Sequence, residues 1–316
     1  MSSGQQMNKR GAFVLPILLV AMAIILMIAP ALLETLKLTA EQVSAAIDRR
    51  TAVDRALSAV ALLRAPVFYC GYGMPSETAA YQNAFFAQKN KEPFCWDGPV
   101  CVSGKSGRAN AELRLAYGMP SGTSAKHSFS NGGAANVALQ NTLTSDSDLI
   151  QPRNGGKPSN VKNWVLFGAM MPPSVPFAVK TAFGNTLGVQ SAASGFVIPE
   201  GEEVYLLRAV KAYCENGCLY TENYRSSGAQ PRVQGIVDMR FELDKAAGTL
   251  TVYVVSRGNL SVTGPQNIDD AEDWPEEYKT AAMASSYRLY ATKITWRLPN
   301  CLRSELPEIT DISARF

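Results

Sequence analysis

One uninterrupted apolar run dominates the N-terminal part of the chain. Residues 12–33 carry no charged side chain, and Lys9, Arg10 and Gly11 stand directly before them. A membrane-crossing helix needs about 20 apolar residues to span the hydrocarbon core, so this run is long enough. The pattern therefore predicts a transmembrane helix over residues 12–33.

The helical pattern continues past this run, because residues 34–64 contain neither glycine nor proline. Pro66 is expected to end the helix, since proline disfavours helical geometry at the residue before it. A single helix over residues 12–64 would be roughly 80 Å long at about 1.5 Å per residue. Pro16 and Pro30 can kink it.

The second half of this helix, residues 34–65, is predicted to be amphipathic. Glu41, Asp48, Arg49 and Asp54 lie mostly off its apolar stripe. The stripe consists of apolar side chains that recur at steps of three, four and seven, as on one helix face: Leu36, Val43, Ala46, Ile47, Val53, Leu57, Val60 and Ala61.

The last third of the chain predicts an antiparallel sheet over residues 203–298. Residues 202–214 and 218–225 are rich in strand-forming side chains and flank a three-residue loop that contains glycine, which is a hairpin signal. In that register Cys214 and Cys218 face each other, close enough for a disulfide.

A second hairpin and one further strand are expected after it. Residues 233–244 and 249–262 form the hairpin, with a turn at residues 245–248, and residues 286–299 supply the strand. One face of that strand is the better core candidate: Arg288, Tyr290, Thr292, Ile294, Trp296 and Leu298.

The region between the helix and this sheet reads differently. Cysteines stand beside aromatic residues in 66–102, which favours a small packed subcore tied by a bridge. Residues 118–160 are rich in Gly, Ser, Asn and Thr and are expected to form a flexible loop or surface insertion. His127, the only histidine, lies in this insertion and is assigned no catalytic part.

Charge and cysteine usage indicate an exported domain over residues 66–316. Lys9 and Arg10 precede the apolar run, and acidic and basic residues are mixed after it, so the positive-inside rule places the N-terminus in the cytoplasm and the remainder in the periplasm. An even number of exported cysteines favours disulfides, whose pairing the sequence leaves open: Cys70, Cys95, Cys101, Cys214, Cys218 and Cys301.

The chemistry of an enzyme is not marked in the sequence. It contains no G-x-S-x-G, Walker A, H-E-x-x-H or dinucleotide-binding motif, so we expect neither catalytic residues nor a cofactor. The formal net charge is only +3 and the basic residues are scattered, which gives no case for nucleic-acid binding. Asp269, Asp270, Glu272 and Asp273 are weak calcium candidates, because they lack the spacing of a calcium loop.

Lys9-Arg10-Gly11 before the apolar run resembles the processing site of type IV prepilins, a family that includes minor pilins and the pseudopilins of type II secretion. The resemblance implies that residues 1–11 are a leader, that prepilin peptidase cuts after Gly11, and that Ala12 becomes a methylated N-terminus. It also implies a pilin-like α+β fold: a long N-terminal helix, transmembrane over 12–33 and amphipathic over 34–65, packed on an antiparallel sheet.

The resemblance further implies a function. The chain would be a subunit of a type IV pilus or a secretion pseudopilus that begins in the inner membrane and reaches the pilus or cell surface. Its partners would be other major and minor pilins or pseudopilins. The family usually carries glutamate where this chain has Pro16. That departure fits a subunit at the filament tip, acting in initiation, adhesion or substrate contact.

Other interpretations remain open at this point. Residues 12–33 can be a plain membrane anchor, or a signal peptide with an Ala-x-Ala site at Ala29 to Ala31. A plain anchor would suit a periplasmic ligand-binding or sensor domain with an uncleaved N-terminus. Cleavage near Ala31 would suit a secreted hydrolase that uses paired carboxylates.

Overall fold

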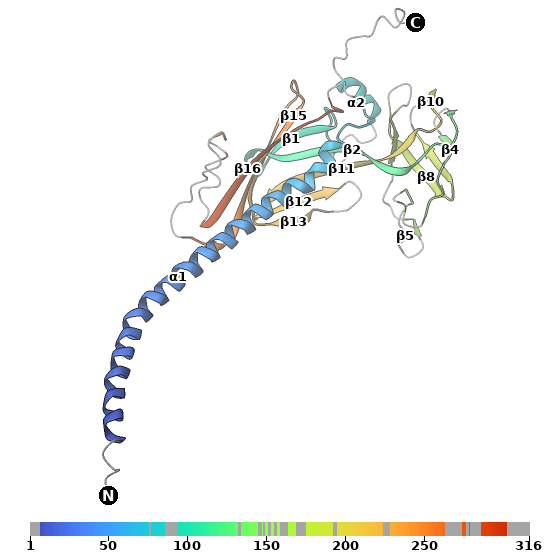
Figure 1. The fold of residues 1–316 in the computed structure, drawn as a ribbon. Helices are drawn as coiled ribbons and strands as arrows, with labels where there is room; N and C mark the ends of the chain where they lie inside the picture. Colours follow the sequence, from blue (N-terminus) through green and yellow to red (C-terminus); the bar gives the residue numbers. More distant parts are fainter. Residues whose placement is uncertain are drawn as a thin grey trace, which may run out of the picture.

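The structure is a computed structural model of an α+β chain, in which one long N-terminal helix precedes antiparallel sheets (Figure 1). The following residues are described: 7–75, 77–85, 94–131, 134–144, 147, 149–150, 153–154, 157–158, 164–168, 175–191, 195–223, 228–262, 274–275, 278 and 286–301.

Helix α1 (Met7–Phe68) confirms the prediction of a single continuous helix. Figure 1 shows that it extends far beyond the strands and bends gradually in its N-terminal half, which contains Pro16 and Pro30. The prediction that Pro66 ends the helix is wrong, because α1 continues to Phe68. A proline loses only one intrahelical hydrogen bond, and Val67, which is 2% exposed, buries its side chain in the core directly after it.

Sixteen strands and a second helix follow within the described residues. They are α2 (Thr78–Ala84), β1 (Val100–Lys105), β2 (Arg108–Ser124), β3 (Phe129–Asn131), β4 (Ala134–Ala138), β5 (Arg153–Asn154), β6 (Lys157–Pro158), β7 (Trp164–Phe167), β8 (Phe177–Phe183), β9 (Thr186–Gln190), β10 (Phe196–Ile198), β11 (Glu203–Glu215), β12 (Cys218–Asn223), β13 (Gln230–Gln234), β14 (Ile236–Asp244), β15 (Thr249–Ser261) and β16 (Tyr287–Arg297).

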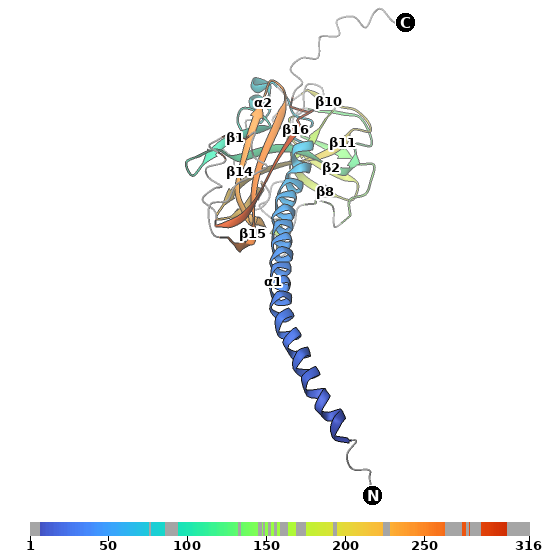
Figure 2. The same ribbon diagram turned by 60° about the vertical axis from the view of Figure 1, so that its left-hand side comes forward.

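Two long strands, β2 and β11, form the spine of the largest sheet. They pair antiparallel from Ser124↔Glu203 to Glu112↔Tyr213. Residues 204–206 of β11 pair with β7, and residues 210–215 pair with β12. One end of the spine therefore carries β1, β12 and β13, and the other end carries β7, β8, β9 and β4. Figures 1 and 2 show the second group well away from the N-terminal end of α1.

A separate three-stranded sheet, β14–β15–β16, lies along the C-terminal half of α1 (Figure 2). The predicted strands and turn of this region are confirmed, except that Val233 and Gln234, expected at the start of the first strand, belong to β13 in the largest sheet. On the predicted core face of β16, Tyr290, Ile294 and Trp296 are partly buried against the main core, and Leu298, directly after the strand, is buried in it. On the opposite face Lys293, Thr295 and Arg297 are exposed, but Ala291 is buried in a smaller cluster.

The main core lies between three elements: the C-terminal half of α1, called the stalk helix below, the end of the spine that carries β1, β12 and β13, and this second sheet. It includes Leu63 of α1, Leu115 of β2, Phe241 of β14 and Val252 of β15, each at most 1% exposed. A second core fills the far end of the spine, with Phe167, Phe177 and Phe196 fully buried. Because β2 and β11 enter both cores, the two halves of the domain are joined by continuous strands.

The segment 118–160, expected to be a loop or insertion, contributes to this second core. Residues 118–124 belong to β2, and β3 and β4 also lie within the segment. Val137, Leu139 and Leu149 are buried there. The scarcity of large apolar residues concealed this role, because a few side chains that all point inward are enough to anchor short strands.

Candidate functional site: the stalk helix and its seat on the sheets

The N-terminal half of α1 is apolar and uncovered. Among the described residues, α1 is the one helix long and apolar enough to cross a membrane, and its most apolar stretch is not buried. Pro16 lies in this part and is exposed. Gly11 and Ala12 lie within α1, and cleavage between them stays a prediction.

The face of α1 that packs on the sheets is lined by small side chains. Ala52, Ala56 and Ala59 are fully buried, and Leu63 and Val67 extend the same row at steps of three and four. Alanine has a short side chain, so the helix approaches the strands of the main core closely. Helix α1 contacts β15, β16, β13 and β2 in this region.

The predicted apolar stripe lies on the opposite side of the helix and faces solvent. Leu36, Val43, Ile47 and Leu57 are 65%, 53%, 62% and 49% exposed. Val60, by contrast, is buried. The exposed stripe is interrupted by Arg50 and Asp54, whose charged groups lie 4.0 Å apart. Residues 34–57 of α1 thus carry an apolar face that none of the described residues covers.

Asp48 was expected on the polar side, but it is only 3% exposed and points into the domain. Its Oδ1 accepts hydrogen bonds from the backbone N–H groups of Asn259 and Leu260, the latter at 3.0 Å. The hydroxyl of Ser256 donates to the carbonyl oxygen of Ala52 at 2.6 Å. These contacts fix α1 to β15.

Arg55, two turns after Asp48 on α1, binds the same part of β15. Its Nη1 donates to the carbonyl oxygens of Arg257 at 2.7 Å and Gly258 at 3.3 Å, and its Nη2 donates to Asn259 Oδ1 at 2.7 Å. The pairing of β15 with β16 is irregular between Arg257 and Ser261. A bulge leaves backbone groups without a strand partner, and here the side chains of α1 supply one.

Asp48 can approach β15 this closely because Gly258 has no side chain. A Cβ atom at this position would overlap the carboxylate of Asp48. Asp48, Arg55 and the bulge at residues 257–260 are called the stalk clasp below. The clasp ties the helix to the sheet by charge-assisted hydrogen bonds, which are stronger than neutral ones.

Further buried charges lie between the two sheets. Asp238 of β14 is 3% exposed and Arg240 is 6% exposed, and Arg240 Nε lies 2.9 Å from Asp238 Oδ2. Arg240 also donates to the carbonyl oxygen of Ala109, and Arg108 lies 3.3 Å from Asp238 Oδ1. Because Ala109 and Arg108 belong to β2, these contacts hold β14 against the largest sheet.

A tyrosine on β15 extends the polar contacts of this region. Burial raises the pKa of Tyr253, and the hydrogen bond that its hydroxyl donates to Glu242 Oε2 at 2.7 Å raises it further. The Tyr278 ring stacks edge-on to Tyr253, with 5.3 Å between the ring centroids. Tyr253 therefore stays neutral at physiological pH and acts as a packing and hydrogen-bonding element.

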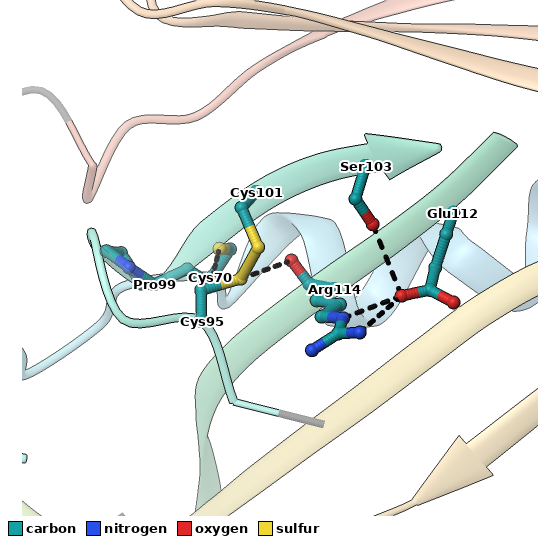
Figure 3. Close-up of a disulfide and its surroundings, with 7 residues drawn as sticks. All are labelled: Cys70, Cys95, Pro99, Cys101, Ser103, Glu112 and Arg114. Atoms are coloured by element: carbon teal, nitrogen blue, oxygen red, sulfur yellow. Dashed lines mark hydrogen bonds and ion pairs between the residues drawn. A yellow bond between two sulfur atoms is a disulfide. The ribbon is translucent and has the colours of Figure 1, made fainter. Parts of the chain in front are cut away.

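The cysteine-rich piece contains one disulfide, as its sequence indicates. Cys95 and Cys101 are bonded and join the segment before β1 to β1 itself (Figure 3). Beside it, Glu112 accepts hydrogen bonds from Ser103 at 3.3 Å and Arg114 at 2.7 Å.

The prediction that Cys214 and Cys218 face each other across the hairpin is wrong. The hairpin turns through two residues, Asn216 and Gly217, both with positive φ, instead of three. Cys218 is therefore opposite Glu215, and Cys214 is opposite Leu219. A shift of one residue moves a side chain to the other face of the sheet, so the two thiols point apart. Burial raises the pKa of Cys214 to about 12.

The remaining predicted site residues are His127 and the four acidic calcium candidates. His127 is exposed after β2. The calcium candidates Asp269, Asp270, Glu272 and Asp273 lie outside the described residues. Within the part of the chain that the structure describes, no group of three or more His, Cys, Asp or Glu side chains is placed to hold a metal ion.

Sequence reasoning missed the stalk clasp. The stepwise alanines at 52, 56 and 59 were the available signal, because small residues at steps of four and three mark a face that approaches another element closely. Nothing in the sequence near 257–260 indicated a bulge that binds Asp48 and Arg55.

Comparisons with known proteins give no family for this chain. No protein-family model matches it, and neither does any curated protein or solved structure.

Proposed function

We propose that this chain is a minor pilin or pseudopilin, a structural subunit that assembles by helix packing into a type IV pilus or a type II secretion pseudopilus. The observation that carries the proposal is the uncovered apolar surface of α1. Its membrane half has no burial, and the exposed stripe Leu36, Val43, Ile47 and Leu57 prolongs that surface alongside the exported domain.

The described residues leave this surface uncovered. Large apolar side chains that remain exposed at regular helical steps mark an interaction surface. The lipid bilayer can cover the first part, but residues 43–57 lie beside the folded domain, where α1 contacts the sheets on its other face. Helices of other pilins or pseudopilins in a filament would bury this stripe and exclude water from it.

The N-terminal sequence supports the same proposal. Lys9, Arg10 and Gly11 stand where the family has its processing site, so prepilin peptidase in the inner membrane would release Ala12 as the mature N-terminus. Pro16 offers no carboxylate for the terminal amine of a neighbouring subunit. An unpaired charge is costly in an apolar filament core, and we therefore place the subunit at or near the tip.

The orientation follows from the flanking charges: the N-terminus stays in the cytoplasm, and the sheets lie in the periplasm until the filament emerges. At the tip, the exported domain acts in filament initiation, adhesion or contact with a secreted substrate. The role is structural and not catalytic.

The variant Ile47→Glu tests the proposed packing. A carboxylate in the middle of the exposed stripe leaves the fold intact, because the side chain faces solvent in the isolated chain. In a filament it would have to be buried without a partner, which costs several kcal/mol. We expect its amount in sheared filaments to fall at least about tenfold, since each 1.4 kcal/mol is a factor of ten.

The matched control is Lys293→Glu, a charge change at an exposed position of β16 away from the stripe. It is expected to stay within about twofold of the parent chain in the same assay, with equal membrane levels of both variants by immunoblot. Normal filament incorporation of Ile47→Glu would contradict the proposal.

A further inference from the structure

The end of the described chain returns to the end of the stalk helix. The N–H of Leu298 donates to the carbonyl oxygen of Gly248 at 2.9 Å, and the side chain of Asn300 donates to the carbonyl oxygen of Phe68 at 3.3 Å. The last residue of this turn, Cys301, packs against the main core. The C-terminal turn 298–301 is thus seated on the C-terminus of α1.

This contact between the C-terminal turn and the end of α1 brings two thiols together. Cys70 Sγ and Cys301 Sγ lie 3.6 Å apart, although 231 positions separate them in the sequence. Cys70 is held in place on both sides, because its N–H donates to the carbonyl oxygen of Val67 at 3.2 Å and it forms a bridge with Tyr117 of β2. A disulfide needs sulfur atoms about 2.05 Å apart, so a small side-chain rotation suffices.

The other four cysteines do not compete for a bond with Cys70 or Cys301. All six cysteines are within the described residues, and Cys95 is already bonded to Cys101. Cys214 and Cys218 point to opposite faces of their sheet. Cys70 and Cys301 are therefore the two free thiols whose positions permit a bond.

We infer that Cys70 and Cys301 form a second disulfide, which covalently fastens the C-terminal turn of the exported domain to the end of the stalk helix. The bond closes a ring over residues 70–301, which contains every strand of the described structure. The inference rests on the export that the proposed function implies, because disulfides persist in oxidising compartments.

Solvent access determines which of the two cysteines reacts first with an oxidant. Cys70 is fully buried, which raises the pKa of its thiol, whereas Cys301 is partly exposed. Cys301 also lines a cavity of about 170 Å³, together with Asp97, Gly248 and Leu298. A disulfide-bearing oxidant, such as a dithiol oxidase in its oxidised form, can therefore reach Cys301 first.

In the first step the Cys301 thiolate attacks the oxidant's disulfide, forms a mixed disulfide and releases one of the oxidant's sulfurs as a thiolate. Cys70 then loses its proton and attacks Cys301 Sγ, which expels the second sulfur. The two cysteines lose two electrons and two protons, and the oxidant leaves as a dithiol.

The test uses the full chain purified in detergent, reduced and then reoxidised with oxidised glutathione, so it does not depend on a filament. Digestion without reductant and mass spectrometry should find peptides linked through Cys70 and Cys301 beside those linked through Cys95 and Cys101. Peptides in which Cys70 or Cys301 stays free, or pairs with Cys214 or Cys218, would overturn the inference.

Thermal unfolding supplies a second readout. A long-range disulfide restricts the unfolded chain, so the oxidised parent chain should melt about 5–10 °C above its reduced form. Cys301→Ser should lose most of this difference, and Cys218→Ser should keep it. Equal differences in the two variants would count against the bond, and because each variant is compared with its own reduced form, a general loss of stability does not affect the result.

Discussion

Replacing Arg240 with alanine is expected to lower the free energy of unfolding by about 3–5 kcal/mol, because the change leaves the carboxylate of Asp238 buried without its closest cation. Asp238 is 3% exposed, and Arg108, its other partner, is half exposed and 3.3 Å away. The substitution also removes the hydrogen bond to Ala109, which joins β14 to β2. Urea unfolding of the full chain in detergent would measure the loss.

Tryptophan fluorescence suits this measurement, since all four tryptophans lie after α1 in the chain. Arg297→Ala is the control, because Arg297 is exposed at the end of β16, and it should change stability by less than about 0.5 kcal/mol. The double variant Asp238→Ala/Arg240→Ala should lose less than the two single losses added together. Additive losses would show that the pair is not coupled.

Replacing Asp48 with alanine is expected to lower the free energy of unfolding by about 2–3 kcal/mol. The change removes the acceptor for the backbone N–H groups of Asn259 and Leu260, which lie in a bulge where no strand can replace it. Asp54→Ala on the same helix is the matched control. Its carboxylate is exposed, and its ion pair with Arg50, at 4.0 Å, is a weak surface contact. The expected loss is therefore below about 1 kcal/mol.

Gly258→Ala gives an independent view of the same clasp. The added methyl group would overlap the Asp48 carboxylate, and an overpacked buried position typically costs about 1–3 kcal/mol. If the clasp holds the stalk, both Asp48→Ala and Gly258→Ala should also make residues 48–60 of α1 more accessible to hydrogen exchange. Equal protection in Asp48→Ala and Asp54→Ala would contradict this role.

Local patterns were enough to predict several of the elements themselves. The strands β11, β12, β14, β15 and β16 and the continuous helix were all visible in the sequence, because runs of strand-forming residues between turn signals, and a long segment without glycine or proline after the apolar run, report on local backbone conformation. That a bridge ties residues 66–102 followed from cysteines beside aromatic residues, but the pairing of Cys95 with Cys101 did not.

Pairing and contact between distant elements could not be read in this way. Asn216 and Gly217 favour a two-residue turn, and counting the loop as three residues placed Cys214 and Cys218 on the same face. The glycine- and serine-rich segment 118–160 hid strands whose inward side chains meet a core built by residues 165–206.

The stalk helix shows the limit most clearly. Its large apolar residues and its small ones form two faces, and the periodicity of Leu36, Val43, Ile47 and Leu57 is the stronger signal. The sheets nevertheless bind the alanine face, because a close approach lets the main core and the stalk clasp form together. Which of two apolar faces is buried inside the chain depends on tertiary contacts that periodicity does not contain.

The N-terminal residue of the protein recovered from membranes tests the proposed function most directly. Edman sequencing and intact mass of the chain, expressed in a cell that contains prepilin peptidase, would identify it. The pilin-like assignment predicts a chain that starts at Ala12 and carries one added methyl group on its terminal amine. A chain that starts at Met1, as a plain anchor would, or at Leu32, as a secreted protein would, contradicts it.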